Sequence, residues 1–205
     1  MKRKIRLQRG SQDDLRLEEF EVEVEQGMVV LDAIHRIQAT EAPDLAVRWN
    51  CKAGKCGSCS AEVNGRPKLT CMTRLSDYPD DETLTVQPMK TFPIIKDLVT
   101  DVSWNYEVNK KIAPYQHTET DEDPIMFQEE VDRVQEFRKC IECFLCQDVC
   151  HVLRSHDMKQ EFAGPRFMIR NAGLEMHPLD QGNRLDNIRN EDGIGLSNIT
   201  KCCSF

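Results

Sequence analysis

Two stretches near the N-terminus alternate between apolar and charged side chains. Ile5 and Leu7 stand on either side of a charged residue, and Phe20, Val22 and Val24 alternate with glutamates. A period of two residues is typical of strands that bury one face and expose the other. The pattern therefore predicts two half-buried strands, the second with an acidic outer face.

A helix is predicted directly after the second strand. Gly27 interrupts the alternation, and apolar residues then recur at helical spacing, at Val30, Leu31, Ile34 and Ile37. His35 lies between these positions without a neighbouring ligand, and we interpret it as structural. Residues 83–86 predict another short strand. Two strands, a helix, a cysteine-bearing loop and more strands resemble the element order of a β-grasp ferredoxin.

The second half of the chain predicts helices and loops. Residues 106–124 are polar and contain Pro114 and Pro124, which is typical of a linker. Asp123 before Pro124 predicts the start of a helix. An apolar stripe follows at helical spacing, at Phe127, Val131, Val134 and Phe137. A further helix is predicted over residues 165–176. We therefore expect an α+β chain, with a ferredoxin-like domain over residues 1–105, a linker over 106–124 and an all-α domain over 125–205.

Composition narrows the class of protein. The 205 residues include 27 Lys and Arg against 35 Asp and Glu, which gives a net charge of -8. Nucleic-acid binding needs a basic face, so nucleic acid is not expected as a partner. No apolar run approaches the roughly 18 to 20 residues that span a bilayer. The basic N-terminus has no apolar segment behind it, as a secretory signal would. We expect neither an integral membrane protein nor one with a cleaved leader.

The ten cysteines fall in three short clusters. Clustered thiols in a chain without a secretory signal are more often metal ligands or redox groups than disulfides. The first cluster comprises Cys51, Cys56, Cys59 and Cys71, with the spacing C-x4-C-x2-C-x11-C. Its first three members match the plant-type spacing for a [2Fe-2S] cluster. The glycines between them would let the loop curl and bring N–H groups close to sulfur.

The eleven-residue gap in this motif predicts a hairpin. Asn64 and Gly65 form a strong signal for a two-residue turn. If this turn closes the hairpin, Val63 faces Arg66, and Cys71 arrives beside Cys59. A zinc site is the weaker interpretation, because tetrahedral zinc sites usually draw on two separated C-x2-C pairs and only one occurs here.

The second cluster has the spacing C-x2-C-x2-C-x3-C, formed by Cys140, Cys143, Cys146 and Cys150. This is the bacterial-ferredoxin run for a cubane cluster, whose fourth cysteine binds the other cluster in two-cluster proteins. Each cubane then needs thiolates from a distant segment. The remaining cysteines are Cys202 and Cys203.

The three groups together resemble the iron-sulfur subunit of succinate dehydrogenase and fumarate reductase. The stretches VQEFRKCIECFLCQDVCHVLR, FAGPRFMIR, LEMHPLD and NITKCC are particularly similar to the actinobacterial type. The resemblance implies [2Fe-2S], [4Fe-4S] and [3Fe-4S] clusters in a line between a flavoprotein subunit and a membrane anchor. It implies three [4Fe-4S] ligands, Cys140, Cys143 and Cys146, and two [3Fe-4S] ligands, Cys150 and Cys203.

The chain departs from the family pattern near its C-terminus. The family ends in C-x5-C-x3-C, but Ser197 stands at the first of these positions and the last would fall beyond Phe205. Cys202 has no ligand position in the pattern. We expect a truncated sequence; the alternatives are Cys202 in place of Ser197 and a partly empty cubane region. No quinone pocket is assigned by analogy, because the residues after Cys150 and after Ser197 do not match the Trp and His that the family often uses near the last cluster. His151 and His156 are nearby candidates, and we interpret them as structural.

The leading functional hypothesis is electron transfer between the flavin of a partner subunit, where succinate is oxidised or fumarate reduced, and a membrane quinone. The expected place is the cytoplasmic face of the bacterial inner membrane, with attachment through an anchor subunit. The rival hypotheses are an iron-sulfur subunit of another flavin-linked complex, such as a heterodisulfide reductase-like one, a zinc-binding scaffold module and a free two-domain ferredoxin.

Overall fold

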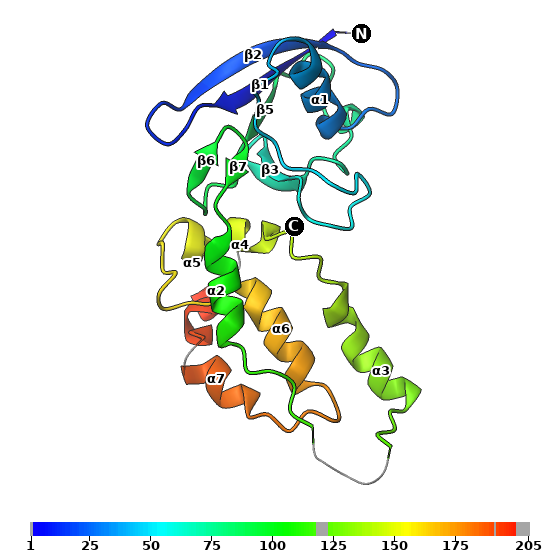
Figure 1. Cartoon of the computed structure of the whole chain (residues 1–205), viewed down its shortest axis with the longest axis vertical. Helices are drawn as coiled ribbons and strands as arrows, with labels where there is room; N and C mark the ends of the chain where they lie inside the picture. The colour runs from blue at the N-terminus through cyan, green and yellow to red at the C-terminus, as the bar shows by residue number, and fades with distance from the viewer. Residues whose placement is uncertain (1, 118–122, 191, 200–205) are drawn as a thin grey trace. The chain divides into compact units, whose positions relative to one another are not determined.

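The computed structural model describes the chain except for residues 1, 118–122, 191 and 200–205 (Figure 1). The chain divides into two compact units. The first comprises Met1–Val102 and Ile141–Val149, and the second comprises Ser103–Cys140 and Cys150–Phe205. The segment Ile141–Val149 thus groups with the first unit, whereas the sequence placed it in the helical domain of residues 125–205.

The first unit is built on a mixed five-stranded sheet with the order β2-β1-β5-β3-β4. Its strands are β1 (Lys2–Arg9), β2 (Arg16–Glu23), β3 (Ser60–Val63), β4 (Arg66–Leu69) and β5 (Leu84–Gln87). Strands β1 and β5 run parallel, and the other neighbours are antiparallel. A second, two-stranded sheet is formed by β6 (Ile94–Lys96) and β7 (Val99–Thr100). The strands predicted from the alternating patterns are confirmed.

Helix α1 (Val30–Thr40) shares one hydrophobic core with the large sheet. Ile5 of β1 pairs directly with Phe20 of β2, and both are buried with Ile34 and Ile37 of the helix. The Asp32 carboxylate accepts a hydrogen bond from the backbone N–H of Val29 at 3.1 Å and so satisfies a donor at the helix start. The predicted helix is confirmed. The unit also contains η1 (Leu75–Asp77) and α4 (Leu145–Val149).

The second unit is helical, with no strand among its described residues. Its elements are α2 (Ser103–Lys111), α3 (Gln128–Gln135), η2 (Glu136–Lys139), α5 (His151–Arg154), α6 (Pro165–Glu175), α7 (Arg184–Asn190) and η3 (Ile194–Ile199). Trp104 of α2 lies edge-on to Phe167 of α6, with ring centroids 6.3 Å apart. Val108 and Ala163 complete this cluster. Mixed sheet and helices together give an α+β fold.

Helix α3 begins later than the sequence predicted. It starts at Gln128 rather than near Asp123 and Pro124. The Glu130 carboxylate accepts a hydrogen bond from the backbone N–H of Phe127 at 2.8 Å, which fixes the first turn four residues downstream. The Phe127 side chain is 71% exposed, so the expected apolar stripe does not begin there.

Part of the expected linker is ordered by contacts within the second unit. Its first residues belong to α2. The Arg184 guanidinium, 1% exposed, then donates hydrogen bonds to the carbonyls of Ala113 and Pro114 at 2.5 and 2.7 Å. The same group pairs with Asp180 at 2.8 Å, and Asp180 accepts the Gln116 backbone N–H at 2.8 Å. Burial opposes ionisation of Asp180, but these donors outweigh it and lower the pKa of the carboxyl.

Candidate metal centres

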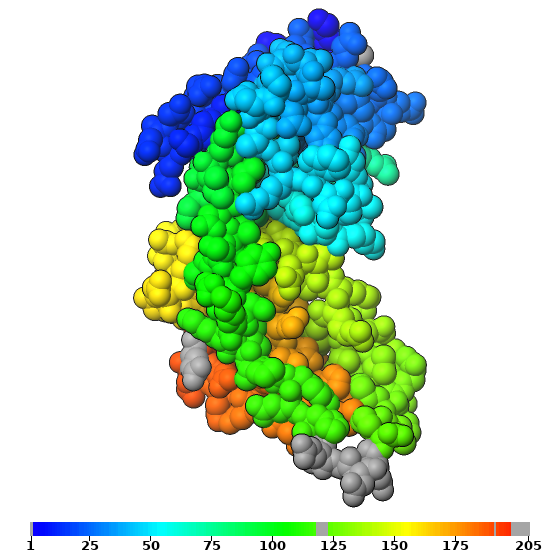
Figure 2. Space-filling view, viewed as in Figure 1, coloured from blue at the N-terminus to red at the C-terminus, as the bar shows by residue number. Residues whose placement is uncertain are grey.

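The first cysteine loop connects the segment after α1 to strand β3. Figure 2 shows this part of the chain, in cyan, at the surface of the first unit. Cys51 is exposed, Cys56 is half-buried, and Cys59 and Cys71 are buried. The backbone N–H groups of Ala53 and Lys55 each donate to Cys51 Sγ at 3.3 Å. Donors aimed at sulfur stabilise negative charge on it, so the loop fits a thiolate-bound cluster.

The hairpin that follows has the predicted register. Val63 pairs with Arg66, and Ser60 pairs with Leu69. Asn64 and Gly65 have φ values of 48° and 74°, as the mirror-image two-residue turn requires. Cys71 therefore arrives beside Cys59, where its N–H lies 3.5 Å from Cys59 Sγ. This prediction, made by counting residues from the turn, is confirmed.

Two thiols in this loop differ sharply in acidity. Hydrogen bonding from the Ser58 side chain, assisted by backbone N–H groups, lowers the pKa of the Cys56 thiol from 9.0 to about 6. Burial, followed by the neighbouring Cys59, raises the pKa of Cys71 to about 11. At neutral pH Cys56 is therefore mostly a thiolate, whereas Cys71 keeps its proton unless a metal ion displaces it.

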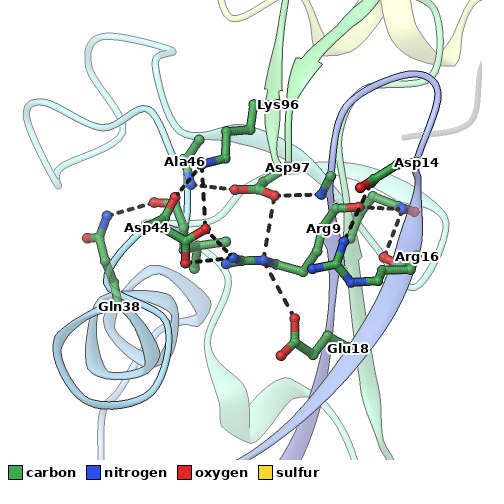
Figure 3. Close-up of polar contacts among 12 residues, drawn as sticks. Arg9, Asp14, Arg16, Glu18, Gln38, Asp44, Ala46, Lys96 and Asp97 are labelled. Carbon is green, nitrogen blue, oxygen red and sulfur yellow. Dashed lines mark hydrogen bonds and ion pairs between the residues drawn. The ribbon is translucent and has the colours of Figure 1, made fainter.

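A buried carboxylate fixes the segment that leads to Cys51. Asp97, which is fully buried in the β6–β7 turn, accepts the backbone N–H groups of Gly10 and Ala46, each at 2.7 Å (Figure 3). Arg9 Nε lies 3.5 Å from Asp97, and the same guanidinium donates to both oxygens of Asp44. That hydrogen bonding lowers the pKa of Asp44. Three separate stretches of chain are joined at this point.

Two side chains that the sequence analysis did not single out, Trp49 and Lys52, flank the loop. Trp49 is 49% exposed, and Lys52 lies over its ring at 4.9 Å. His35 meets the same ring edge-on, with centroids 4.8 Å apart. Burial, together with Lys52, lowers the pKa of His35, so its imidazole is neutral at pH 7. The position of Trp49, two residues before Cys51, was the available sequence signal.

The second cysteine run is divided between the two units. Cys143 and Cys146 lie on the segment Ile141–Val149 of the first unit, whereas Cys140 and Cys150 belong to the second unit. Cys140 is exposed and Cys150 is buried. Glu142 and Phe144, on either side of Cys143, have φ values of 56° and 60°. Two left-handed residues turn the chain sharply around this cysteine.

The C-terminal candidates are placed only in part. Ser197 lies exposed in η3. Cys202 and Cys203 lie outside the described residues. Within the described part of the chain, no three or more His, Cys, Asp or Glu side chains are grouped so as to hold a single metal ion.

Comparison with known proteins identifies the family. Residues 3–107 match the family model described as a 2Fe-2S iron-sulfur cluster binding domain. The chain is 32% identical to the fumarate reductase iron-sulfur subunit of Mycobacterium tuberculosis, and the match covers 90% of this chain and 76% of that relative. This chain belongs to the iron-sulfur subunits of fumarate reductase and succinate dehydrogenase.

Other relatives agree with this membership. The fumarate reductase iron-sulfur subunit of Wolinella succinogenes is 29% identical over 90% of this iron-sulfur subunit and 80% of its own length. Among solved structures, a chain of the Mycobacterium smegmatis Sdh1 complex in the apo form superimposes with a TM-score of 0.95 at 56% identity, covering 98% of this chain and 86% of that one. In the described part of the subunit, none of the helices has the length and apolarity needed to cross a membrane.

Proposed function

We propose that this subunit carries electrons one at a time between the flavin of a partner flavoprotein and a quinone near a membrane-anchor subunit. The partner oxidises succinate to fumarate, which releases two electrons and two protons, or runs the reverse reaction. Family membership carries the proposal, supported by 56% identity to a chain of the Sdh1 complex. The site of action is the cytoplasmic face of the bacterial inner membrane.

The first unit would be a β-grasp domain that holds the [2Fe-2S] cluster through Cys51, Cys56, Cys59 and Cys71. Bound clusters supply reversible one-electron redox chemistry. The protein's own task is to place the thiolates and to set the stability of each charge state. The N–H groups of Ala53 and Lys55 aimed at Cys51 Sγ favour the more negative, reduced state.

The second cysteine run would serve two further clusters, as in a bacterial ferredoxin-like helical domain. Cys140, Cys143 and Cys146 would supply three ligands of a [4Fe-4S] cluster. Cys150, which is buried, would bind a [3Fe-4S] cluster together with Cys203. Burial of Cys150 against Val152 and Leu153 keeps water away from its sulfur.

The proposal is tested on the native complex, purified through a tag on this subunit. We expect flavin fluorescence in the purified material, acid-labile sulfide, and low-temperature paramagnetic signals of three clusters. One zinc per chain without sulfide, or a subunit that purifies without a flavoprotein, would contradict the proposal.

Two matched variants test the ligand assignment. Cys59→Ala removes a thiolate for which residues 1–102 hold no spare cysteine, so the [2Fe-2S] signal should disappear. Cys143→Ala should remove the [4Fe-4S] signal and leave the [2Fe-2S] signal in place. Met72→Leu, which changes an exposed neighbour of Cys71, is the control and should leave both signals intact. A full [2Fe-2S] signal in Cys59→Ala would refute the assignment.

A further inference from the structure

The segment Ile141–Val149 is bound to the first unit by contacts at both of its ends. Near its end, the backbone N–H of Thr91 donates to the buried Asp148 carboxylate at 3.0 Å. In its middle, Phe144 lies edge-on to Phe92, with centroids 6.3 Å apart. Near its start, Cys143 contacts the first cysteine loop. The segment is therefore a part of the first unit, although it lies about 40 residues after Val102.

Ser60 links the two cysteine-bearing segments at Cys143. Its hydroxyl lies 2.8 Å from the carbonyl of Gly57 and 2.8 Å from the carbonyl of Cys143. Both carbonyls are acceptors, and one hydroxyl carries one proton, so the two share a single donor. Ser60 is only 9% exposed, which shields this donor from water. Removing the Ser60 hydroxyl would take this shared donor away from two carbonyls in a buried place, which costs free energy.

Gly57 brings the two backbones into direct contact. A Cβ atom at this position would lie 2.6 Å from Cys143 Cα and 2.9 Å from its backbone nitrogen. Such an approach is impossible without moving one backbone away from the other, because the obstructing atoms are main-chain atoms. The loop that carries Cys56 and Cys59 therefore touches the main chain of Cys143 only because residue 57 has no side chain.

We propose that Ser60 and Gly57 are positioning residues that fix the distance between the first cysteine group and Cys143. The inference rests on the proposed function, because that distance matters only if both cysteine groups hold clusters. The rate of electron tunnelling falls off exponentially with distance. Direct contact between the main chains of Gly57 and Cys143 therefore gives the shortest available distance between the two cysteine groups. Ser60 then holds this separation constant by bonding both loops at once.

The chain supplies a matched control for the glycine. Gly54 lies in the same loop with a φ of 64°, close to the 69° of Gly57. A Cβ at Gly54 would meet the flexible Met72 side chain instead of main chain. Gly57→Ala and Gly54→Ala therefore carry a similar cost of left-handed backbone, but only the first separates the loop from Cys143. Ser60→Thr keeps the hydroxyl and is the matched control for Ser60→Ala.

The test measures the magnetic interaction between the reduced [2Fe-2S] cluster and its neighbour in the purified complex. We expect Gly57→Ala and Ser60→Ala to weaken the relaxation enhancement of the [2Fe-2S] signal severalfold, while Gly54→Ala and Ser60→Thr stay near wild type. A second readout needs no cluster signal. Hydrogen exchange of the Thr91 amide should become severalfold faster in Gly57→Ala and Ser60→Ala, because the whole segment loosens.

The two proposals fail in different ways. A complex without paramagnetic clusters would contradict the proposed function, and amide exchange at Thr91 would still decide the roles of Ser60 and Gly57. Unchanged relaxation and unchanged exchange in Ser60→Ala would overturn the positioning role, even if Gly57→Ala fails to fold. An equal effect of Gly54→Ala and Gly57→Ala would also overturn it, since strain in the loop would then be the cause.

Discussion

Each unit contains a buried arginine–aspartate pair, and the two pairs differ in which member makes most of the hydrogen bonds to the backbone. In the first unit, Asp97 receives the N–H groups of Gly10 and Ala46, and Arg9 neutralises its charge. In the second unit, the arginine does most of the backbone binding, because Arg184 donates to two carbonyls. A carboxylate can secure only donors, and a guanidinium can secure only acceptors.

The difference follows from what each irregular segment leaves unpaired. Backbone polar groups that are buried outside helices and strands need partners from elsewhere. The stretch before the first cysteine loop presents the N–H of Ala46 to Asp97, and the stretch after α2 presents two carbonyls to Arg184 and the N–H of Gln116 to Asp180. Each unit thus fixes a segment that has no regular structure through an arginine–aspartate pair, in which the aspartate accepts from N–H groups and the arginine donates to carbonyls where they are present.

The largest effect is expected from Arg184→Met. The change leaves Asp180 buried without its partner and frees the carbonyls of Ala113 and Pro114. Breaking a buried pair from one side costs about 3–5 kcal/mol in the free energy of unfolding. Urea unfolding followed by circular dichroism measures it. Lys139→Met, which removes an exposed ion pair with Glu136, is the control and should cost less than about 1 kcal/mol. Equal losses in both variants would contradict the role of Arg184.

A smaller effect is expected from Asp97→Asn. Asparagine keeps the shape and tolerates the φ of 50° found at this position, but it loses the charge that binds two N–H groups and Arg9. Hydrogen bonds to a charged group are each worth about 1.5–3 kcal/mol, so we expect a loss in that range. The hydrogen-exchange rate of the Ala46 amide should rise in the same variant, because this amide donates to Asp97. Asp44→Asn removes the charge of the exposed partner of Arg9 and should shift the urea midpoint less than Asp97→Asn does. An equal shift in both variants would show that the exposed ion pair, and not the buried Asp97, provides the stabilisation.

The smallest effect is a difference in acid sensitivity. Since the pKa of Asp180 is lowered in the folded chain, its contribution to stability is present above the unfolded pKa of about 4 and is lost as the pH falls below it. Protection of the Gln116 amide should therefore fall more steeply in wild type than in Asp180→Asn between pH 6 and pH 3. Parallel curves would show that Asp180 does not hold this amide through its charge.

Local patterns made much of the first unit predictable. The alternation around Ile5 and Phe20 gave β1 and β2, and the Asn64–Gly65 turn gave the hairpin register, because both depend on neighbours in sequence. The acceptor role of Asp97 was not predictable, since its partners Gly10 and Ala46 are distant in the chain. The four cysteines of the first loop could be grouped because all lie within 21 residues.

The second cysteine run shows the limit of the same reasoning. Its spacing predicts a cubane site, but spacing does not reveal that Cys143 folds with the first unit. That placement depends on Ser60, on Thr91 and on the missing side chain of Gly57, none of which stands out in the sequence. The start of α3 was misplaced because Pro124 was a stronger local signal than Glu130, whose carboxylate decides the first turn.

The Asn64–Gly65 turn also bears on how the protein ages. In an Asn-Gly pair, the glycine nitrogen can attack the asparagine side-chain carbonyl, release ammonia and reroute the main chain through the side-chain carbon. Here the Asn64 oxygen accepts the Thr85 N–H at 2.8 Å, and its nitrogen donates to Glu82 at 2.6 Å. These bonds hold the amide away from the attacking nitrogen, so the folded chain should deamidate slowly and the unfolded chain quickly. A converted turn would contain one extra backbone atom, and Cys71 would no longer arrive beside Cys59, so a single chemical lesion at Asn64 would break up the first cysteine group, whose last member lies seven residues away.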